Sequence, residues 1–182
     1  MNNQRGLLVV DVETTGFIPG KNACVEIGAV RLDQDLIIKT EFTSLVSPWS
    51  GAEIVPEAMR VNQISLEDLN AAPRIEDVIK AFDAQLGDDA KLLTICGWNV
   101  WFDVSFLRDA YARAGIKWPF GYRLIDVQSI FSFLNNFECL SQEKAISKLF
   151  DESQSHRALA DAKHTAQILK WITQKNRQII QC

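Results

Sequence analysis

A chain of 182 residues, 47% hydrophobic and 23% charged, has room for one folded domain with a substantial buried core. Its net charge of −4 argues against a protein that coats long stretches of nucleic acid, because that role needs many basic side chains to neutralise phosphates. No apolar run approaches the roughly 20 residues of a membrane helix, so we expect no membrane role.

The N-terminal segment and the cysteines bear on the location of the protein. The apolar stretch 7–10 is too short, and too soon followed by acidic residues, for a secretion signal. The cysteines are Cys24, Cys96, Cys139 and Cys182. They form neither a CxxC pair nor a Cys/His cluster, which argues against a zinc site or a disulfide framework. A reducing cytoplasm is the predicted location.

The first third of the chain is rich in strand signals. Residues 7–12 form a continuous apolar run, typical of a strand covered on both faces, and a Thr-Thr-Gly turn ends it. Residues 25–32 and 37–46 are rich in β-branched side chains and are separated by a polar turn at 33–35. We expect these three strands to form an antiparallel meander.

Helices dominate the rest of the chain. Short helical turns are expected at residues 56–60 and 65–69, and longer helices follow where apolar residues recur at helical spacing. The predicted longer helices cover residues 73–86, 103–114, 126–134, 141–150 and 158–172, with one further strand at 91–96. Strands followed by helices interleaved with a short strand favour an α/β domain, with a mixed sheet flanked by helices.

Two carboxylates lie at the end of the first predicted strand. Asp11 and Glu13 are two residues apart, so the alternation of a strand points both side chains to the same face. Carboxylates held this close repel each other, and one takes up a proton unless a cation lies between them. A divalent metal ion is the natural cation. The pair alone fits a polar strand end before a turn equally well.

Two further acids lie at the starts of predicted helices. Asp103 lies in line with the apolar Phe106 and Leu107, and Asp161 lies in register with Ala158 and Thr165. Burying an unpaired charge is costly, so each carboxylate needs a partner. Taken singly, each acid is better explained as a helix cap or as a complement to the helix dipole.

The two histidines of the chain differ in position. His156 lies in a polar loop five residues before Asp161, where an imidazole beside a metal-bound water can act as a general base near neutral pH. A lone histidine in a loop is usually a surface residue, so this role depends on its neighbours. His164 lies one helical turn beyond Asp161 and is predicted to be solvated.

Three segments taken together resemble the motifs of one enzyme family. Residues 11–16 (DVETTG), 99–107 (NVWFDVSFL) and 156–162 (HRALADA) look like the three exonuclease motifs of the DEDDh 3'-5' exonuclease family. Their order and spacing match across nearly the whole chain. The resemblance implies a ribonuclease-H-like α/β fold, with a mixed five-stranded sheet flanked by helices, and a single exonuclease domain over residues 1–182.

The resemblance also implies roles for the charged motif residues. The implied metal ligands are Asp11, Glu13, Asp103 and Asp161. Two Mg²⁺ or Mn²⁺ ions held there would activate a water on one side of the phosphorus and stabilise the leaving 3'-oxygen on the other. His156 is implied as the base that deprotonates this water. The products would be nucleoside 5'-monophosphates.

Other residues are implied to hold the terminal nucleotide. By the resemblance, Thr14 and Thr15 lie against this nucleotide, and Phe102 packs on its sugar or base. The weaker candidates are Glu57, Ala58, Val61 and Asn62. Trp98 stands where many members of the family have histidine, and Asn62-Gln63 replaces a common His-Gly pair, so substrate preference stays open. Trp98 and Trp101 are individually more typical of core or rim packing than of nucleotide platforms.

Several functions agree with these motifs. The main prediction is a stand-alone exonuclease that acts on single-stranded 3' ends of DNA, RNA or both. RNA 3'-end trimming, as in ribonuclease T, is the first alternative, and a homodimer would accompany it. A polymerase proofreading subunit is disfavoured because little chain follows the last predicted helix. A non-catalytic nucleic-acid-binding module on the same fold is disfavoured because all five motif residues are present.

Overall fold

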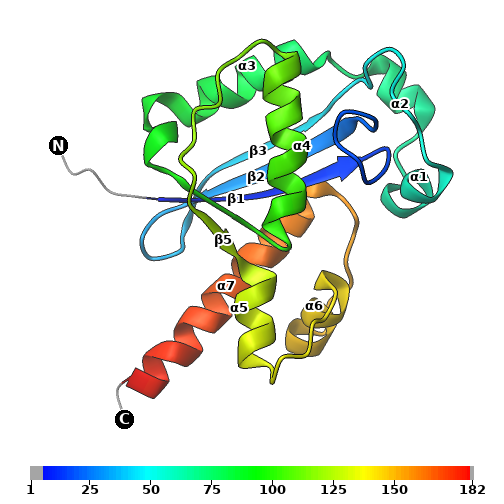
Figure 1. The fold of residues 1–182 in the computed structure, drawn as a ribbon. Helices are drawn as coiled ribbons and strands as arrows, with labels where there is room; N and C mark the ends of the chain where they lie inside the picture. The colour runs from blue at the N-terminus through cyan, green and yellow to red at the C-terminus, as the bar shows by residue number, and fades with distance from the viewer. Residues whose placement is uncertain (1–5, 181–182) are drawn as a thin grey trace.

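Figure 1 shows the computed structural model, which describes residues 6–180. In these residues a five-stranded sheet has the order β3-β2-β1-β4-β5. The strands are β1 (Leu7–Thr14), β2 (Cys24–Leu32), β3 (Ile38–Leu45), β4 (Thr94–Gly97) and β5 (Leu124–Asp126). The sheet is mixed because β1 pairs antiparallel with β2 but parallel with β4. The predicted meander and the predicted mixed sheet are thus confirmed.

Helices cover both faces of the sheet (Figure 1). They are α1 (Pro56–Asn62), α2 (Leu66–Ala71), α3 (Ile75–Leu86), α4 (Val100–Arg113), α5 (Val127–Leu134), α6 (Gln142–Phe150) and α7 (Ala158–Ile180). Val10 of β1 packs in a core with α3 and α4, whereas Val9 packs in a core with α5, α6 and α7. Successive residues of β1 therefore face opposite helical layers, which explains its continuous apolar run.

Several predicted boundaries differ from the structure. Residues 87–92 form the 3₁₀ helix η1 (Gly87–Leu92), so the strand predicted at 91–96 is limited to β4. Helix α4 begins three residues before Asp103, after Asn99 in a left-handed conformation with φ of 56°. Strand β5 has three residues, too few for a hydrophobic period to reveal it.

Helix α7 extends to Ile180, beyond the predicted end at residue 172. The apolar stripe on which the prediction is based ends at Ile172, which is the last buried core residue of the helix among the side chains described, those up to residue 175. Among the helices in the described part of the chain, none is both long enough and apolar enough to cross a bilayer.

Candidate active site

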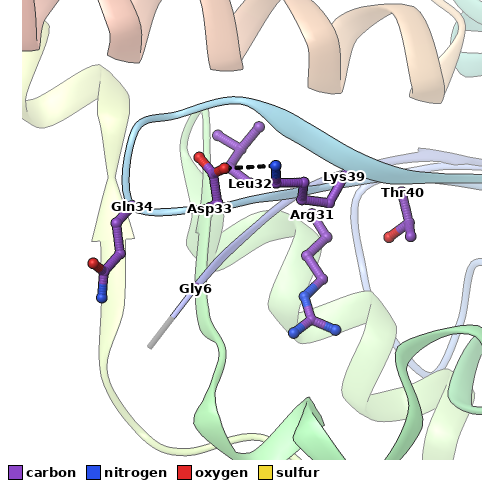
Figure 2. A pocket seen from close by; sticks show the side chains of 7 residues that line it. All are labelled: Gly6, Arg31, Leu32, Asp33, Gln34, Lys39 and Thr40. Atoms are coloured by element: carbon purple, nitrogen blue, oxygen red, sulfur yellow. Dashed lines mark ion pairs between the residues drawn. The ribbon is translucent and has the colours of Figure 1, made fainter. Parts of the chain in front are cut away.

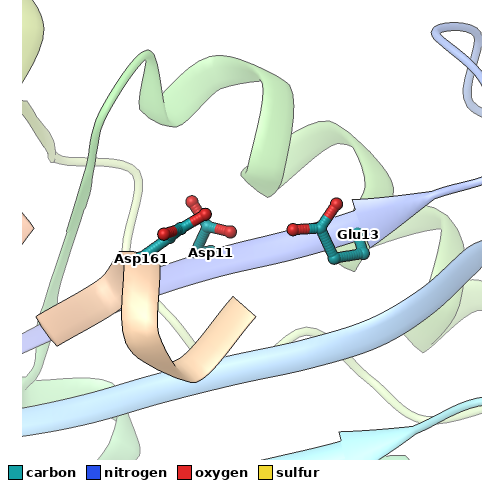
Figure 3. Close-up of side chains that lie close together, drawn as sticks. All are labelled: Asp11, Glu13 and Asp161. Atoms are coloured by element: carbon teal, nitrogen blue, oxygen red, sulfur yellow. The ribbon is translucent and has the colours of Figure 1, made fainter. Parts of the chain in front are cut away.

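The end of β1 and the start of α7 bring three carboxylates together. Asp11 and Glu13 lie on the face of β1 that α7 covers, and Asp161 comes from the first turn of α7. One ligand oxygen from each of the three lies within 4.8 Å of the others (Figure 3). Asp161 is buried, whereas Asp11 and Glu13 are partly exposed. Residues far apart in sequence thus form a compact group with the oxygen ligands that Mg²⁺ and Mn²⁺ prefer.

Asp103 is a fourth carboxylate close to this group. It lies in the first turn of α4, is 3% exposed, and its Oδ1 accepts a hydrogen bond from the Val12 N–H at 3.0 Å. Its charge is the largest of the neighbouring charges that raise the pKa of Asp11. The carboxylate of Asp103 therefore points at β1 and lies at the margin of the group rather than within it.

All four carboxylates have raised pKa values. Burial is the largest cause for each of them. The charges of Asp103, Asp161 and Glu13 raise the pKa of Asp11 further, and the pKa of Glu13 rises to about 8. Without a cation, the site thus favours protonated carboxyls near neutral pH. Bound divalent cations would reverse this preference, so the donor set fits the metal ions that the family resemblance implies.

Glu26 of β2 anchors the start of α7. Its carboxylate accepts from Nη2 and Nε of Arg157, at 2.7 and 3.1 Å, and from the Ala158 N–H at 3.2 Å. Glu26 is 2% exposed and lies opposite Glu13 in the strand register. Sequence analysis missed this residue, although a lone acid within an apolar strand is a signal that it has a buried partner.

Gly28 allows α7 to lie against β2. A Cβ atom at this position would lie 2.1 Å from the carbonyl carbon of Ala158. Because that contact is to backbone, a larger residue would push the helix away from the strand. Gly28 and Glu26 therefore set the distance between Asp161 and β1.

His156 lies in the loop between α6 and α7, close to the carboxylates. Its side chain is partly buried and its backbone has a positive φ of 50°, which is uncommon for a residue with a side chain. A charge on His156 is among the influences that lower the pKa of Asp161. The loop that carries this histidine leads directly into the first turn of α7, which carries Asp161.

His164 is not the solvated residue that the sequence predicted. Its side chain is 13% exposed, with Nδ1 at 3.5 Å from Oδ1 of Asp161 and Nε2 at 3.4 Å from Oε2 of Glu152. The prediction is wrong because the loop 151–157 covers this side of α7. Helical spacing alone does not show such a loop.

Two threonines shape the turn after β1. Thr15 is fully buried, and its hydroxyl donates to the Glu53 carbonyl at 2.7 Å and accepts from the Ala23 N–H at 2.8 Å. The Thr14 hydroxyl donates to the Gly16 carbonyl at 2.6 Å. Both side chains thus hold the turn, and the Thr15 hydroxyl is already fully paired.

The candidate substrate-binding residues in α1 differ in burial: one binds the end of β1, and others are exposed. Asn62 is 2% exposed; its side chain donates to the Thr14 carbonyl at 3.2 Å and accepts from the Ile64 N–H. This contact ties α1 to the end of β1. Val61 is 51% exposed, and the exposed Glu57 pairs with Arg60. Ala58 is partly buried.

The aromatic candidates differ in how far they are exposed to solvent. Trp98 is 8% exposed and packs against Phe131 in the core between the sheet and α7, so it is a core residue. Trp101 is 65% exposed at the start of α4. Phe102 is partly buried, with its ring centroid 5.0 Å from that of Phe106.

Asp126 is a second residue that sequence analysis missed. Its Oδ1 accepts from the Val100 N–H at 3.2 Å, and its Oδ2 accepts from the Ser129 N–H at 3.3 Å. One carboxylate therefore holds the starts of both α4 and α5, and its charge raises the pKa of Asp103. The one sequence signal for this role of Asp126 is its position at the start of a predicted helix. The strand that it ends is too short to recognise from the sequence.

A separate hollow lies at the opposite end of β1 (Figure 2). It is lined by Gly6, Arg31, Leu32, Asp33, Gln34, Lys39 and Thr40. Within it, Lys39 pairs with Asp33 at 2.9 Å, and Arg31 pairs with Asp89 outside it at 3.1 Å. Because Gly6 precedes β1 and the carboxylates lie near its end, this hollow is distinct from the candidate site.

Comparison with known proteins assigns this chain to a class of nucleases. A family model described as exonuclease matches residues 8–169, which include all five motif residues. The chain therefore belongs to this exonuclease family, and the resemblance seen in its sequence motifs is confirmed.

Individual relatives agree with this assignment. Ribonuclease T of Haemophilus influenzae is 29% identical over 178 residues, which cover 88% of this chain and 76% of that protein. The chain spans only 25% of a relative from Mycobacterium tuberculosis, at 33% identity. It spans 11% of the DNA polymerase III PolC-type protein of Thermotoga maritima, at 32% identity.

Solved structures share the fold. The nuclease domain of 3'hExo, described as a DEDDh family member bound to rAMP, matches with a TM-score of 0.77 at 18% identity, covering 96% of this chain and 94% of that one. Exonuclease I of E. coli in complex with a dT13 oligonucleotide matches with a TM-score of 0.80 at 17% identity, covering 98% of this chain and 43% of that one. The predicted ribonuclease-H-like fold is thus confirmed.

Proposed function

We propose that this protein is a two-metal-ion 3'-5' exonuclease that hydrolyses phosphodiester bonds at single-stranded 3' ends of DNA or RNA. The observation that carries this proposal is the convergence of Asp11, Glu13 and Asp161 within 4.8 Å, with Asp103 beside them. Their raised pKa values mark a group whose negative charges need cations nearby.

The four carboxylates are proposed to hold two Mg²⁺ or Mn²⁺ ions. When bound, such ions lower the pKa of a coordinated water and stabilise the charge on the leaving oxygen. Asp11 and Glu13 offer ligands from a rigid strand, and Asp161 offers one from a helix that Glu26 and Gly28 hold against the sheet. Ligands on rigid elements suit a reaction that needs accurate positioning of the phosphate.

His156 is proposed to accept the proton of the attacking water. Its partly buried side chain lies in the loop that leads into the first turn of α7, and its charge acts on the pKa of Asp161. A neutral imidazole is a suitable base near neutral pH. We therefore expect the His156→Ala variant to bind a 3' end while cleaving it about 10²–10⁴ times more slowly.

The terminal nucleotide is proposed to lie between the turn after β1, α1 and the start of α4. Phe102 is partly buried there, and Val61 and Glu57 are exposed on α1, next to the Asn62 contact with β1. Packing of a sugar or base on an aromatic side chain tolerates different bases, as a trimming enzyme requires. Thr14, Thr15 and Ala58 would shape this pocket mainly through the backbone.

A degradation assay tests the proposal. Single strands labelled at the 5' end are incubated with Mg²⁺ or Mn²⁺ and with the wild type, Asp11→Ala or His156→Ala. We expect the wild type to shorten the strand stepwise from the 3' end and to release nucleoside 5'-monophosphates, Asp11→Ala to shorten nothing, and His156→Ala to shorten the strand far more slowly. If the wild type binds the strand and shortens nothing, the chain is a nucleic-acid-binding module.

A second candidate is RNA 3'-end trimming in the manner of ribonuclease T. The alignment with that protein, which covers 88% of this chain, favours it. Parallel reactions on RNA, DNA, blunt duplex and overhang substrates distinguish the candidates, and light scattering tests the homodimer. A strong preference for short RNA overhangs supports trimming, whereas equal rates on DNA and RNA support the broader activity.

A further inference from the structure

Gln142 and Gln154 bind to each other and to Asp161 through hydrogen bonds, and we call this pair of glutamines the latch. Gln154, in the loop that carries His156, donates from Nε2 to Oδ2 of Asp161 and to Oε1 of Gln142, each at 2.8 Å. Gln142, at the start of α6, donates from Nε2 to the carbonyl of Asp161 and to Oγ1 of Thr165, again at 2.8 Å. The loop and α6 thus both bind Asp161 of α7, the loop at its carboxylate and α6 at its backbone carbonyl.

The latch is buried and well paired. Gln142, Asp161 and Thr165 are 6%, 1% and 0% exposed, and Gln154 is partly buried. Buried amide groups need hydrogen-bond partners, so each carboxamide has little freedom to turn. The NH₂ group of Gln154 must face Asp161, because its oxygen would repel the carboxylate.

The two oxygens of Asp161 consequently differ. Oδ2 is held by Gln154, whereas Oδ1 has no hydrogen-bond partner among residues 6–175, the part of the chain whose side chains are described. His164 Nδ1 approaches Oδ1 to 3.5 Å. An unpaired buried oxygen in a group of three carboxylates is the atom available to a cation.

We propose that Gln154 is a positioning residue, which fixes the carboxylate of Asp161 so that Oδ1 is presented to a divalent metal ion. Gln142 holds Gln154 in place from α6. This inference rests on the proposed metal-dependent function and deepens it. The physical reason is that hydrogen-bond partners of a ligating carboxylate restrict its rotation in advance, so the carboxylate loses less conformational entropy when the ion binds.

Calorimetric titration of the full chain with Mn²⁺ alone tests the role of Gln154. We expect Gln154→Glu and Gln154→Ala to raise the Mn²⁺ dissociation constant about 10–100-fold, since loss of such partners weakens metal sites by this factor. Gln154→Glu is nearly isosteric but replaces the donor by an acceptor facing Asp161. Gln167→Glu, on an exposed position of α7, adds the same charge and should leave the constant unchanged.

Two further measurements separate the possible failures. Circular dichroism and thermal melting establish that each variant is folded, and Gln154→Ala serves if the added charge of Gln154→Glu unfolds the protein. If Asp161→Asn loses Mn²⁺ binding while both Gln154 variants bind within twofold of the wild type, the latch is overturned and the proposed function stands. If Asp161→Asn binds Mn²⁺ like the wild type, the proposed metal site is itself wrong, and the latch proposal fails with it.

Discussion

At the scale of single residues, the carboxylates of the site are unfavourable to the fold until a cation binds. Four acids converge where burial and mutual repulsion raise their pKa values. In the metal-free protein, repulsion between these carboxylates and their loss of hydration destabilise the fold. Bound cations would offset both effects. The residues proposed to bind metal ions are therefore residues that lower the stability of the metal-free fold.

The raised pKa values predict that the free energy of unfolding depends on pH. The pKa of Glu13 rises from its ordinary 4.5 to about 8 on folding, so between these values the folded protein binds more protons than the unfolded chain. The free energy of unfolding of the metal-free protein should therefore fall as pH rises from 5 to 8. Urea unfolding at several pH values, in the presence of a chelator, measures this free energy of unfolding.

A matched variant isolates the contribution of Glu13. Glu13→Gln cannot ionise, so its free energy of unfolding should fall less steeply between pH 5 and 8. Saturating Mg²⁺ should also reduce the slope for the wild type, because the ion replaces the proton. Equal slopes for wild type and variant, both metal-free, would contradict the assigned shift.

At the scale of elements, the site depends on how closely α7 approaches β2. Glu26 pairs with the start of the helix, and Gly28 leaves room for its backbone. The helix brings Asp161 to β1, and the preceding loop brings His156. A small displacement of α7 would therefore move two of the proposed catalytic residues together.

Gly28→Ala tests this dependence. The added Cβ would lie 2.1 Å from the Ala158 carbonyl carbon, so α7 must shift. We expect a loss of about 3 kcal/mol in the free energy of unfolding, at the upper end of overpacking effects. A displacement of about 1 Å should lower the cleavage rate roughly 100-fold.

Gly121→Ala is the control for this substitution. No heavy atom lies within 4 Å of a Cβ built at Gly121. Its free energy of unfolding and cleavage rate should stay close to those of the wild type. Chemical denaturation and a single-turnover assay on both variants provide the comparison, and wild-type behaviour of Gly28→Ala would refute the close-approach argument.

At the scale of the whole molecule, metal binding should stabilise the fold. An ion that binds only the folded protein adds about 2.7 kcal/mol at a free concentration of 100 times its dissociation constant. For a domain of this size, that stabilisation corresponds to a rise in Tm of about 5–10 °C. Thermal melting with Mg²⁺ or Mn²⁺ measures the shift. Asp161→Asn should show a smaller rise, and equal shifts in both proteins would place the bound ion elsewhere.

The sequence by itself determined the strand meander, most helices and the five motif residues. Each depends on a local pattern: the apolar run of β1, the helical spacing of α3, and the short segments around Asp11, Asp103 and Asp161. Hydrophobic periodicity and motif spacing are properties of residues close together in sequence, so they can be recognised without knowledge of the fold.

Only the tertiary structure decided which residues hold these motifs in place. Glu26 meets Arg157, Asp126 meets Val100, and the loop before α7 encloses His164. The first pair spans 131 sequence positions and the second spans 26. Such partners depend on how whole elements pack, and packing follows from the buried surface of many residues together, which no single segment encodes.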